Sequence, residues 1–128
     1  MEKPIILLVE DDTITQDVIR FFLQDYYDLD VVENGIAAID AVKSKKYFAI
    51  LMDINLGKGK SGIDVTREIR LMPEGKDIPI IAETAFAMRG DKQEFLAAGC
   101  NYYLAKPFTR DEILRVLDKI NKDIALNS

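Results

Sequence analysis

Acidic and basic side chains follow the apolar segments of this chain, and their types suit phosphoryl chemistry. Glu10 and Asp11 come directly after the first apolar run, Asp53 ends another, and Thr84 and Lys106 follow two more. An aspartate carboxylate can attack phosphorus to form an acyl phosphate, provided that positive charge neutralises the transferring group. We therefore interpret Asp53 as a candidate nucleophile and Lys106 as the positive side chain beside it.

Each of these residues alone has a simpler structural role, such as a helix cap or a solvated charge. Together, the carboxylates would repel one another in a shared cleft, which raises their pKa values unless a cation compensates. The chain has no histidine and one cysteine, so oxygen donors dominate, and these favour Mg²⁺, for which Mn²⁺ can substitute. The Thr84 hydroxyl can bind a phosphoryl oxygen once Asp53 is modified, which would make Thr84 a sensor.

Short apolar runs rich in β-branched residues alternate with segments of helical periodicity. We predict strands near residues 5–9, 29–33, 48–53, 78–82 and 102–105. Continuous apolar strands are typical of a parallel sheet covered on both faces, which predicts a doubly wound α/β sandwich. In such a sheet the ligand site lies outside the carboxyl ends of the strands, where the chemical side chains are expected to meet.

The intervening helices are predicted from stripes of apolar residues at helical spacing. The stripes are Ile14, Val18, Phe21 and Phe22; Ile36, Ile39 and Val42; Val65, Ile69 and Met72; a weaker pair, Met88 and Phe95; and Ile113, Leu117, Ile120 and Ile124. Thr109 is predicted to cap the last helix, and polar residues 121–128 close the chain. We expect one domain over residues 1–128.

Composition narrows the classes of function. The lack of histidine excludes a triad that uses it and argues against an ordinary zinc site. The net charge is −5 and no basic stripe is present, so we expect no direct binding of nucleic acid. The apolar runs are too short to cross a bilayer and there is no signal-peptide pattern, so we expect a cytoplasmic protein without membrane association. Cys100 is expected to be a small buried side chain.

The combined pattern resembles the receiver domain of response regulators in two-component signalling, over essentially the whole chain. Leu8–Asp12 is similar to the acidic end of the family's first strand, which implies that Glu10 and Asp11 bind the metal and that Asp12 is a neighbour or cap. Ile50–Asn55 is similar to the phosphoacceptor strand. This implies that Asp53 is phosphorylated and binds the metal, together with the backbone carbonyl of Asn55.

Two further stretches complete the resemblance. The stretch Ala82–Ala85 implies that Thr84 is the switch threonine. The stretch Tyr103–Phe108 implies that Tyr103 is the aromatic switch residue and that Lys106 is the family's site lysine. In the family, the peptide bond between this lysine and the proline after it is usually cis. The family's fold is a flavodoxin-like sandwich of five strand–helix units with the sheet order 2-1-3-4-5.

The function that the resemblance implies is a phosphorylation-activated switch. A phosphohistidine of a histidine kinase or histidine phosphotransfer protein would donate its phosphoryl group to Asp53 in a Mg²⁺-dependent reaction. Partner binding would then change at the face of the fourth helix, fifth strand and fifth helix. Such a domain catalyses its own phosphorylation and dephosphorylation and is not a conventional enzyme. We expect a monomer or weak dimer.

The sequence departs from the family locally. Gly57 replaces a frequent proline, and the loop at residues 57–61 is one residue longer than usual. Glu83 replaces a commonly apolar residue, and this added carboxylate is expected to disfavour or shorten the phosphorylated state. Asn55 and Phe86 flank the expected path of attacking water, which a bulky Phe86 would slow. The segment 84–100 is similar to receivers attached to hybrid histidine kinases.

Two other classes of function stay open. A receiver-like module can bind a partner without being phosphorylated, although the complete set of site residues argues against this. A phosphohydrolase of the haloacid dehalogenase type also uses an aspartyl phosphate, but its nucleophile follows the first strand in an Asp-x-Asp pattern. The first strand here ends in Glu10-Asp11-Asp12, and turnover of a small phosphomonoester would distinguish the enzyme from a receiver.

Overall fold

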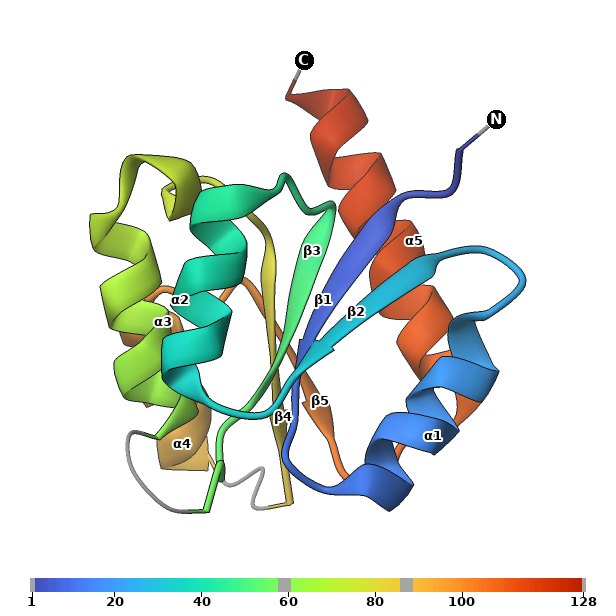
Figure 1. Ribbon diagram of the computed structural model, residues 1–128, viewed down its shortest axis with the longest axis horizontal. Helices are drawn as coiled ribbons and strands as arrows, with labels where there is room; N and C mark the ends of the chain where they lie inside the picture. The colour runs from blue at the N-terminus through green and yellow to red at the C-terminus, as the bar shows by residue number, and fades with distance from the viewer. Residues whose placement is uncertain (1, 58–60, 86–88, 128) are drawn as a thin grey trace.

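The computed structural model describes residues 2–57, 61–85 and 89–127 and contains one five-stranded sheet (Figure 1). Its strands, all parallel, are β1 (Ile5–Val9), β2 (Asp28–Val32), β3 (Ala49–Asp53), β4 (Ile80–Thr84) and β5 (Tyr102–Ala105), in the order β2-β1-β3-β4-β5. Between and after them lie α1 (Thr13–Leu23), α2 (Gly35–Ser44), α3 (Gly62–Leu71), a short 3-10 helix (Pro73–Gly75), α4 (Arg89–Ala98) and α5 (Arg110–Leu126). The predicted fold class and strand order are confirmed.

The helices cover both faces of the sheet and bury two apolar clusters. Helices α1 and α5 lie on one face, and α2, α3 and α4 lie on the other (Figure 1). Successive strand residues alternate between the clusters: Ile6 and Leu8 of β1 contact the α1/α5 side, whereas Leu7 and Val9 contact the other. The continuous apolar strands of the sequence therefore reflect burial on both faces.

The predicted apolar stripe of α1 is wrong for three of its four residues, whereas the fourth, Phe22, packs against the core. Ile14, Val18 and Phe21 are 72%, 43% and 65% exposed, whereas Ile19 and Leu23 are buried. Apolar side chains occur on more than one face of this helix, so periodicity could not decide which face packs on the sheet. The helix instead leaves an apolar surface open to solvent.

The stripe of α2 is also partly wrong, because Ile36 is 74% exposed and the buried face contains Gly35, Ala38 and Val42. A Cβ atom at Gly35 would lie only 2.6 Å from Cγ2 of Val65. Helices α2 and α3 therefore approach closely here, and the close contact selects small residues instead of isoleucine.

The stripes of the other helices are largely confirmed. The buried members are Val65 and Ile69 in α3, Phe95 in α4, and Ile113, Leu117 and Ile120 in α5, whereas Met88 lies outside the described residues. Ile124 is 47% exposed because α5 continues past the end of the sheet (Figure 1). The helix runs to Leu126 and so includes most of residues 121–128, which were predicted only as a polar end of the chain. Cys100 is buried, as expected.

Two polar residues begin helices as the sequence predicted. Asp12 caps α1 by accepting the Thr15 N–H at 2.9 Å. Thr109 caps α5 in a capping box with Glu112, whose side chain accepts the Thr109 N–H. These caps satisfy backbone donors that a helix start leaves unpaired and fix the chain's exit from β1 and its entry into α5.

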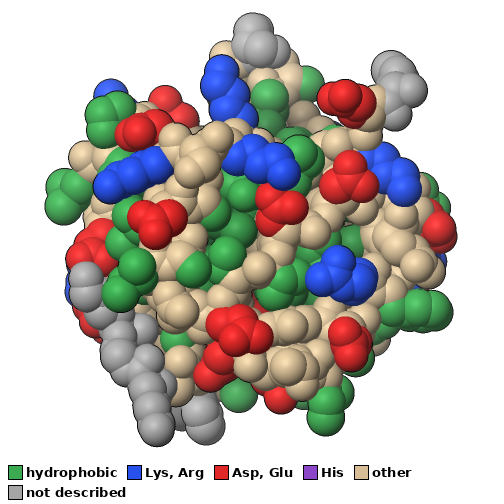
Figure 2. Space-filling model, viewed as in Figure 1, with side chains coloured by type: hydrophobic (Ala, Val, Ile, Leu, Met, Phe, Trp, Pro, Cys, Tyr) green, Lys and Arg blue, Asp and Glu red, His purple; other side chains and the backbone are tan. Residues whose placement is uncertain are grey.

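The surface carries charges of both signs. On the face drawn in Figure 2, Lys and Arg side chains are interspersed with Asp and Glu and separated by apolar patches. In the described part of the chain, no helix combines the length and apolar character needed to span a membrane.

Helix α3 begins directly against the end of β3. The N–H of Gly62 donates to the carbonyl of Ile54 at 3.0 Å. A Cβ atom at Gly62 would lie 2.2 Å from the backbone oxygen of Asp53 and 2.8 Å from Cα of Ile54. Only glycine allows this approach, so the start of α3 helps to fix the position of Asp53.

We predict that Gly62→Ala destabilises the protein by about 1–3 kcal/mol, because the added methyl group meets backbone that cannot move aside cheaply. Urea unfolding measures this change. Arg67→Ala on the exposed side of α3 is the control and should change stability by less than about 0.5 kcal/mol. Equal stability of Gly62→Ala and the wild type would show that the close contact has no structural importance.

Candidate functional site

Four charged side chains lie in one row at the carboxyl edge of the sheet. Each of the four comes two positions after a strand residue that belongs to the core cluster on the α1/α5 side of the sheet. Because side chains alternate along a strand, all four charged side chains are directed to that same side. The core residues are Leu8, Leu51, Ile81 and Leu104, and the charged residues that follow them are Glu10, Asp53, Glu83 and Lys106. Four neighbouring strands therefore deliver three carboxyl groups and one ammonium group to one place.

Lys106 connects two of these carboxyl groups. Its Nζ lies 3.2 Å from Oε1 of Glu10 and 3.3 Å from Oδ1 of Asp53, and the side chains of Glu10 and Asp53 are only 1% and 4% exposed. Burial alone would lower the pKa of Lys106, but the nearby Glu83, Asp53 and Glu10 together raise it. Lys106 therefore keeps its positive charge in a largely buried setting.

The Glu10 carboxyl group is buried next to that of Asp53. Burial, and next the hydrogen bond with the Asp53 carboxyl, raise the pKa of Glu10 to about 7. The N–H of Asp12 donates to Oε2 of Glu10 at 3.2 Å and offsets part of this effect. One ammonium group does not balance the carboxylates, so a further cation would stabilise their ionised forms.

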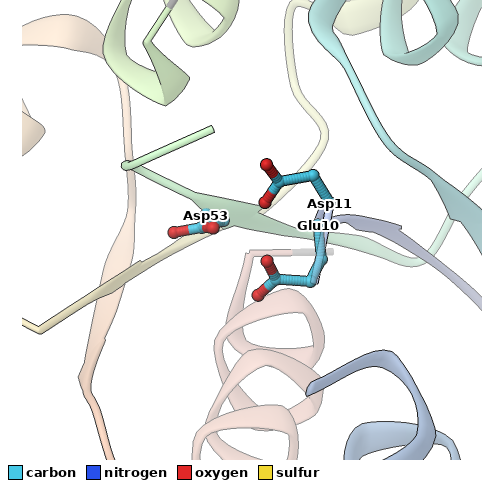
Figure 3. Close-up of side chains that lie close together, drawn as sticks. All are labelled: Glu10, Asp11 and Asp53. Carbon is cyan, nitrogen blue, oxygen red and sulfur yellow. The ribbon is translucent and has the colours of Figure 1, made fainter. Parts of the chain in front are cut away.

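Glu10, Asp11 and Asp53 form a cluster suited to such a cation. One carboxylate oxygen of each residue lies within 4.8 Å of the others, and Figure 3 shows the three side chains converging from the ends of β1 and β3. The donors are hard oxygens, and Asp11 is exposed, which leaves room for water or a phosphoryl oxygen. Gly57 approaches closely, since a Cβ atom there would lie 2.9 Å from Oδ2 of Asp11. These residues fit Mg²⁺.

Asn55 follows β3 and contacts Asp53. The N–H of Asn55 donates to Oδ1 of Asp53 at 3.1 Å, the same oxygen that Lys106 contacts. The Asn55 backbone is thus beside the cluster, as the predicted metal role of its carbonyl requires. Phe86, the other residue expected beside the water path, lies outside the described residues, as do residues 58–60 of the loop.

The two predicted switch residues lie on neighbouring strands. Thr84 ends β4 and is 2% exposed, and its carbonyl accepts the N–H of Lys106 at 2.7 Å. Tyr103 on β5 is 36% exposed, with Nζ of Lys92 from α4 at 4.9 Å from its ring centroid. The Lys106–Pro107 bond is cis, as the family resemblance implied.

Glu83 and the outer face of α1 add features that sequence reasoning missed. Glu83 was identified as a departure from the family, but its complete burial was not foreseen. Burial raises its pKa to about 8, and neither carboxylate oxygen has a hydrogen-bond partner among the described residues.

A surface cavity of about 380 Å³ lies beside α1. It is lined by Ile14, Val18, Phe22, Lys106, Pro107, Phe108 and other residues of α1 and the β4 and β5 ends. The excess of apolar residues in α1 was the available signal.

Comparison with known proteins identifies the family. The family model of the response regulator receiver domain matches residues 6–118, and the chain belongs to this family. The polar-differentiation response regulator DivK of Brucella anthropi is 34% identical over 105 residues, covering 81% of this chain and 85% of that protein.

Two solved structures are similar over most of the chain. The receiver domain of sensor histidine kinase PA1611 from Pseudomonas aeruginosa, with magnesium coordinated in its active site cleft, is 44% identical with a TM-score of 0.85, covering 93% of this chain and 98% of that one. The second is the receiver domain of the Saccharomyces cerevisiae response regulator Ssk1, crystallised with the histidine phosphotransfer protein Ypd1. It is 29% identical with a TM-score of 0.81, and the match covers 91% of this chain and 87% of that one.

We predict that Asp11→Asn weakens Mg²⁺ binding at least about tenfold, because it removes a charged ligand without disturbing the buried pair. Calorimetric titration with Mg²⁺ measures this. The matched control is Asp12→Asn at the next position, where asparagine preserves the helix cap and affinity should stay within about twofold. If Asp11→Asn and Asp12→Asn lose Mg²⁺ affinity equally, the overall negative charge of the site attracts the ion and Asp11 is not a specific ligand.

Proposed function

We propose that this protein is a phosphorylation-activated signalling switch in which Asp53 accepts a phosphoryl group from a phosphohistidine. The donor is a histidine kinase or a histidine phosphotransfer protein. The observation that carries the proposal is the buried Asp53 carboxylate, which contacts Lys106 and shares the candidate metal cluster with Glu10 and Asp11. The magnesium in the PA1611 receiver and the Ssk1–Ypd1 complex support this metal and this class of partner.

The chain's own residues would perform the transfer as follows. Bound Mg²⁺, held by Glu10, Asp11, Asp53 and the Asn55 carbonyl, would supply positive charge for the transferring group. Asp53 attacks phosphorus, the bond from phosphorus to the donor's imidazole nitrogen breaks, and the histidine stays with the donor. Lys106 stabilises the phosphoryl oxygens during transfer. The acyl phosphate is later hydrolysed to restore Asp53 and release phosphate, so the domain catalyses its own modification and reset.

Phosphorylation would be sensed by Thr84 and Tyr103. The Thr84 hydroxyl turns toward the phosphoryl group, and the space that it leaves lets Tyr103 move inward from its exposed position. The cation–π contact between Lys92 and Tyr103 is then lost. Because Lys92 is on α4 and Tyr103 on β5, this movement changes the α4-β5-α5 surface and shifts its affinity for an output partner.

The donor would approach from the other side, over α1. Ile14 and Val18 are exposed next to Phe22, and the cavity beneath them reaches Lys106 and Phe108. An apolar patch that reaches Lys106, the residue in contact with Asp53, suits a helical donor that must bring its phosphohistidine to Asp53. Donor docking and output binding would then use different faces of the domain.

The remaining expectations belong to the same proposal. A single domain over residues 1–128 would act in the cytoplasm as a monomer or weak dimer, and it would turn over no separate substrate. Nucleic acid would not bind directly, in keeping with the interspersed charges on the face drawn in Figure 2.

We predict that acetyl phosphate adds one phosphoryl group to the wild type only when Mg²⁺ is present, and that Asp53→Ala abolishes the adduct. Intact-protein mass measures this, with Asp64→Ala, which removes an exposed carboxylate on α3, as the control that keeps the adduct. A phosphorylated histidine phosphotransfer protein serves as a second donor. If neither donor modifies the folded wild type, the protein is a binding module that works without phosphorylation.

A further inference from the structure

We propose that Glu83 is a positioning residue: its buried carboxyl group receives the Lys106 ammonium when a divalent cation occupies Glu10, Asp11 and Asp53. Lys106 would thus have two partners in turn, the metal-site carboxylates without the ion and Glu83 with it. This inference rests on the metal site of the proposed function and adds a residue to it.

The strand order places Glu83 under the path of Lys106. Lys106 follows β5, whereas Asp53 ends β3, and β4 lies between these strands. To contact Asp53 at 3.3 Å, the Lys106 side chain has to cross the end of β4. Glu83 is the β4 residue paired with Asp53 in the sheet register, and alternation directs it to the same face.

The Glu83 carboxyl group also lacks a hydrogen-bond partner among the described residues. The Glu83 side chain is fully buried, and neither carboxylate oxygen accepts a hydrogen bond within the described residues. Buried polar groups are normally paired, and an exception calls for a physical reason, such as a partner that arrives in another state. An apolar side chain would fill this core position without that cost.

A bound cation supplies the reason for Lys106 to move. Glu10 and Asp53 contact Lys106 and also belong to the metal cluster. A cation bound in this cluster would compete with Lys106 for their carboxylate oxygens, and its charge would repel the ammonium group. The remaining carboxyl group in the row is that of Glu83, on the strand next to β5. The ammonium can thus move a short way along the row and stay paired.

We test this with Mg²⁺ titration of the wild type, Glu83→Gln and Glu83→Leu, followed by calorimetry. Glutamine keeps an oxygen that accepts a hydrogen bond from Lys106, whereas leucine fills the space without an acceptor. We expect Glu83→Gln to bind Mg²⁺ within about twofold of the wild type and Glu83→Leu to bind about tenfold more weakly. If Glu83 acted only through its negative charge, both variants would lose Mg²⁺ affinity equally, because both replacement side chains are neutral.

Two further readouts separate positioning from a structural role. Without Mg²⁺, Glu83→Leu should unfold at a higher urea concentration than the wild type, so stability and ion affinity change in opposite directions. A crystal structure of the wild type with Mg²⁺ should place Nζ of Lys106 within hydrogen-bond distance of Glu83. Equal Mg²⁺ affinity of all three proteins, or Lys106 still on Asp53 beside the ion, would overturn the proposal.

Failure of the metal site itself gives a different result. If the wild type binds no Mg²⁺, the role of Glu83 falls together with the metal role in the proposed function. If the wild type binds Mg²⁺ and is phosphorylated at Asp53 while Glu83→Leu behaves like the wild type, only the role of Glu83 is overturned.

Discussion

The contact of Lys106 with Glu10 and Asp53 is the interaction on which the site depends. These carboxyl groups are almost completely buried and belong to adjacent strands, so without the ammonium group their repulsion would oppose the packing of the sheet edge. One ammonium group faces three carboxyl groups at this edge. Burial is the main cause that raises the pKa values of Glu10 and Glu83, and neighbouring carboxyl groups raise them further, whereas Lys106 lowers them. The site is therefore built to gain positive charge, and a metal ion and a phosphoryl group would arrive together without a large change in net charge.

The fold provides this site by rigid packing. Glu10, Asp53 and Glu83 lie at the ends of β1, β3 and β4, which are buried on both faces, and this leaves these strand ends little freedom to move. The close contact of α3 with the end of β3 at Gly62 fixes the surroundings of Asp53 further. The parts that respond to phosphorylation in our proposal, Tyr103 and its neighbour Lys92, lie on the exposed side of β5 and α4, where movement costs less.

The sequence pattern predicted the strands and the residues at their ends, because β-branched apolar runs followed by charged residues are a strong local signal of buried parallel strands. The fourth strand lies at Ile80–Thr84, two residues after the predicted 78–82, and the strand order was implied by the family resemblance. The pattern could not predict which side of α1 packs, since Ile14, Val18 and Phe21 look like core residues until α5 and the sheet fill the other side. The complete burial of Glu83 was also missed, because a carboxylate at the end of a strand is usually exposed to solvent. Residues set by tertiary packing were missed, whereas residues set by local pattern were found.

The most direct measurement of the central claim is a crystal structure of the protein with Mg²⁺ and beryllofluoride, a stable mimic of an aspartyl phosphate. We expect beryllium bound to the carboxylate of Asp53, with the ion held by Glu10 and Asp11, and with Lys106 and the Thr84 hydroxyl both contacting fluorine. An adduct missing from Asp53 at saturating Mg²⁺ and beryllofluoride, or one that neither Lys106 nor Thr84 contacts, would contradict a switch operated by phosphorylation of this residue.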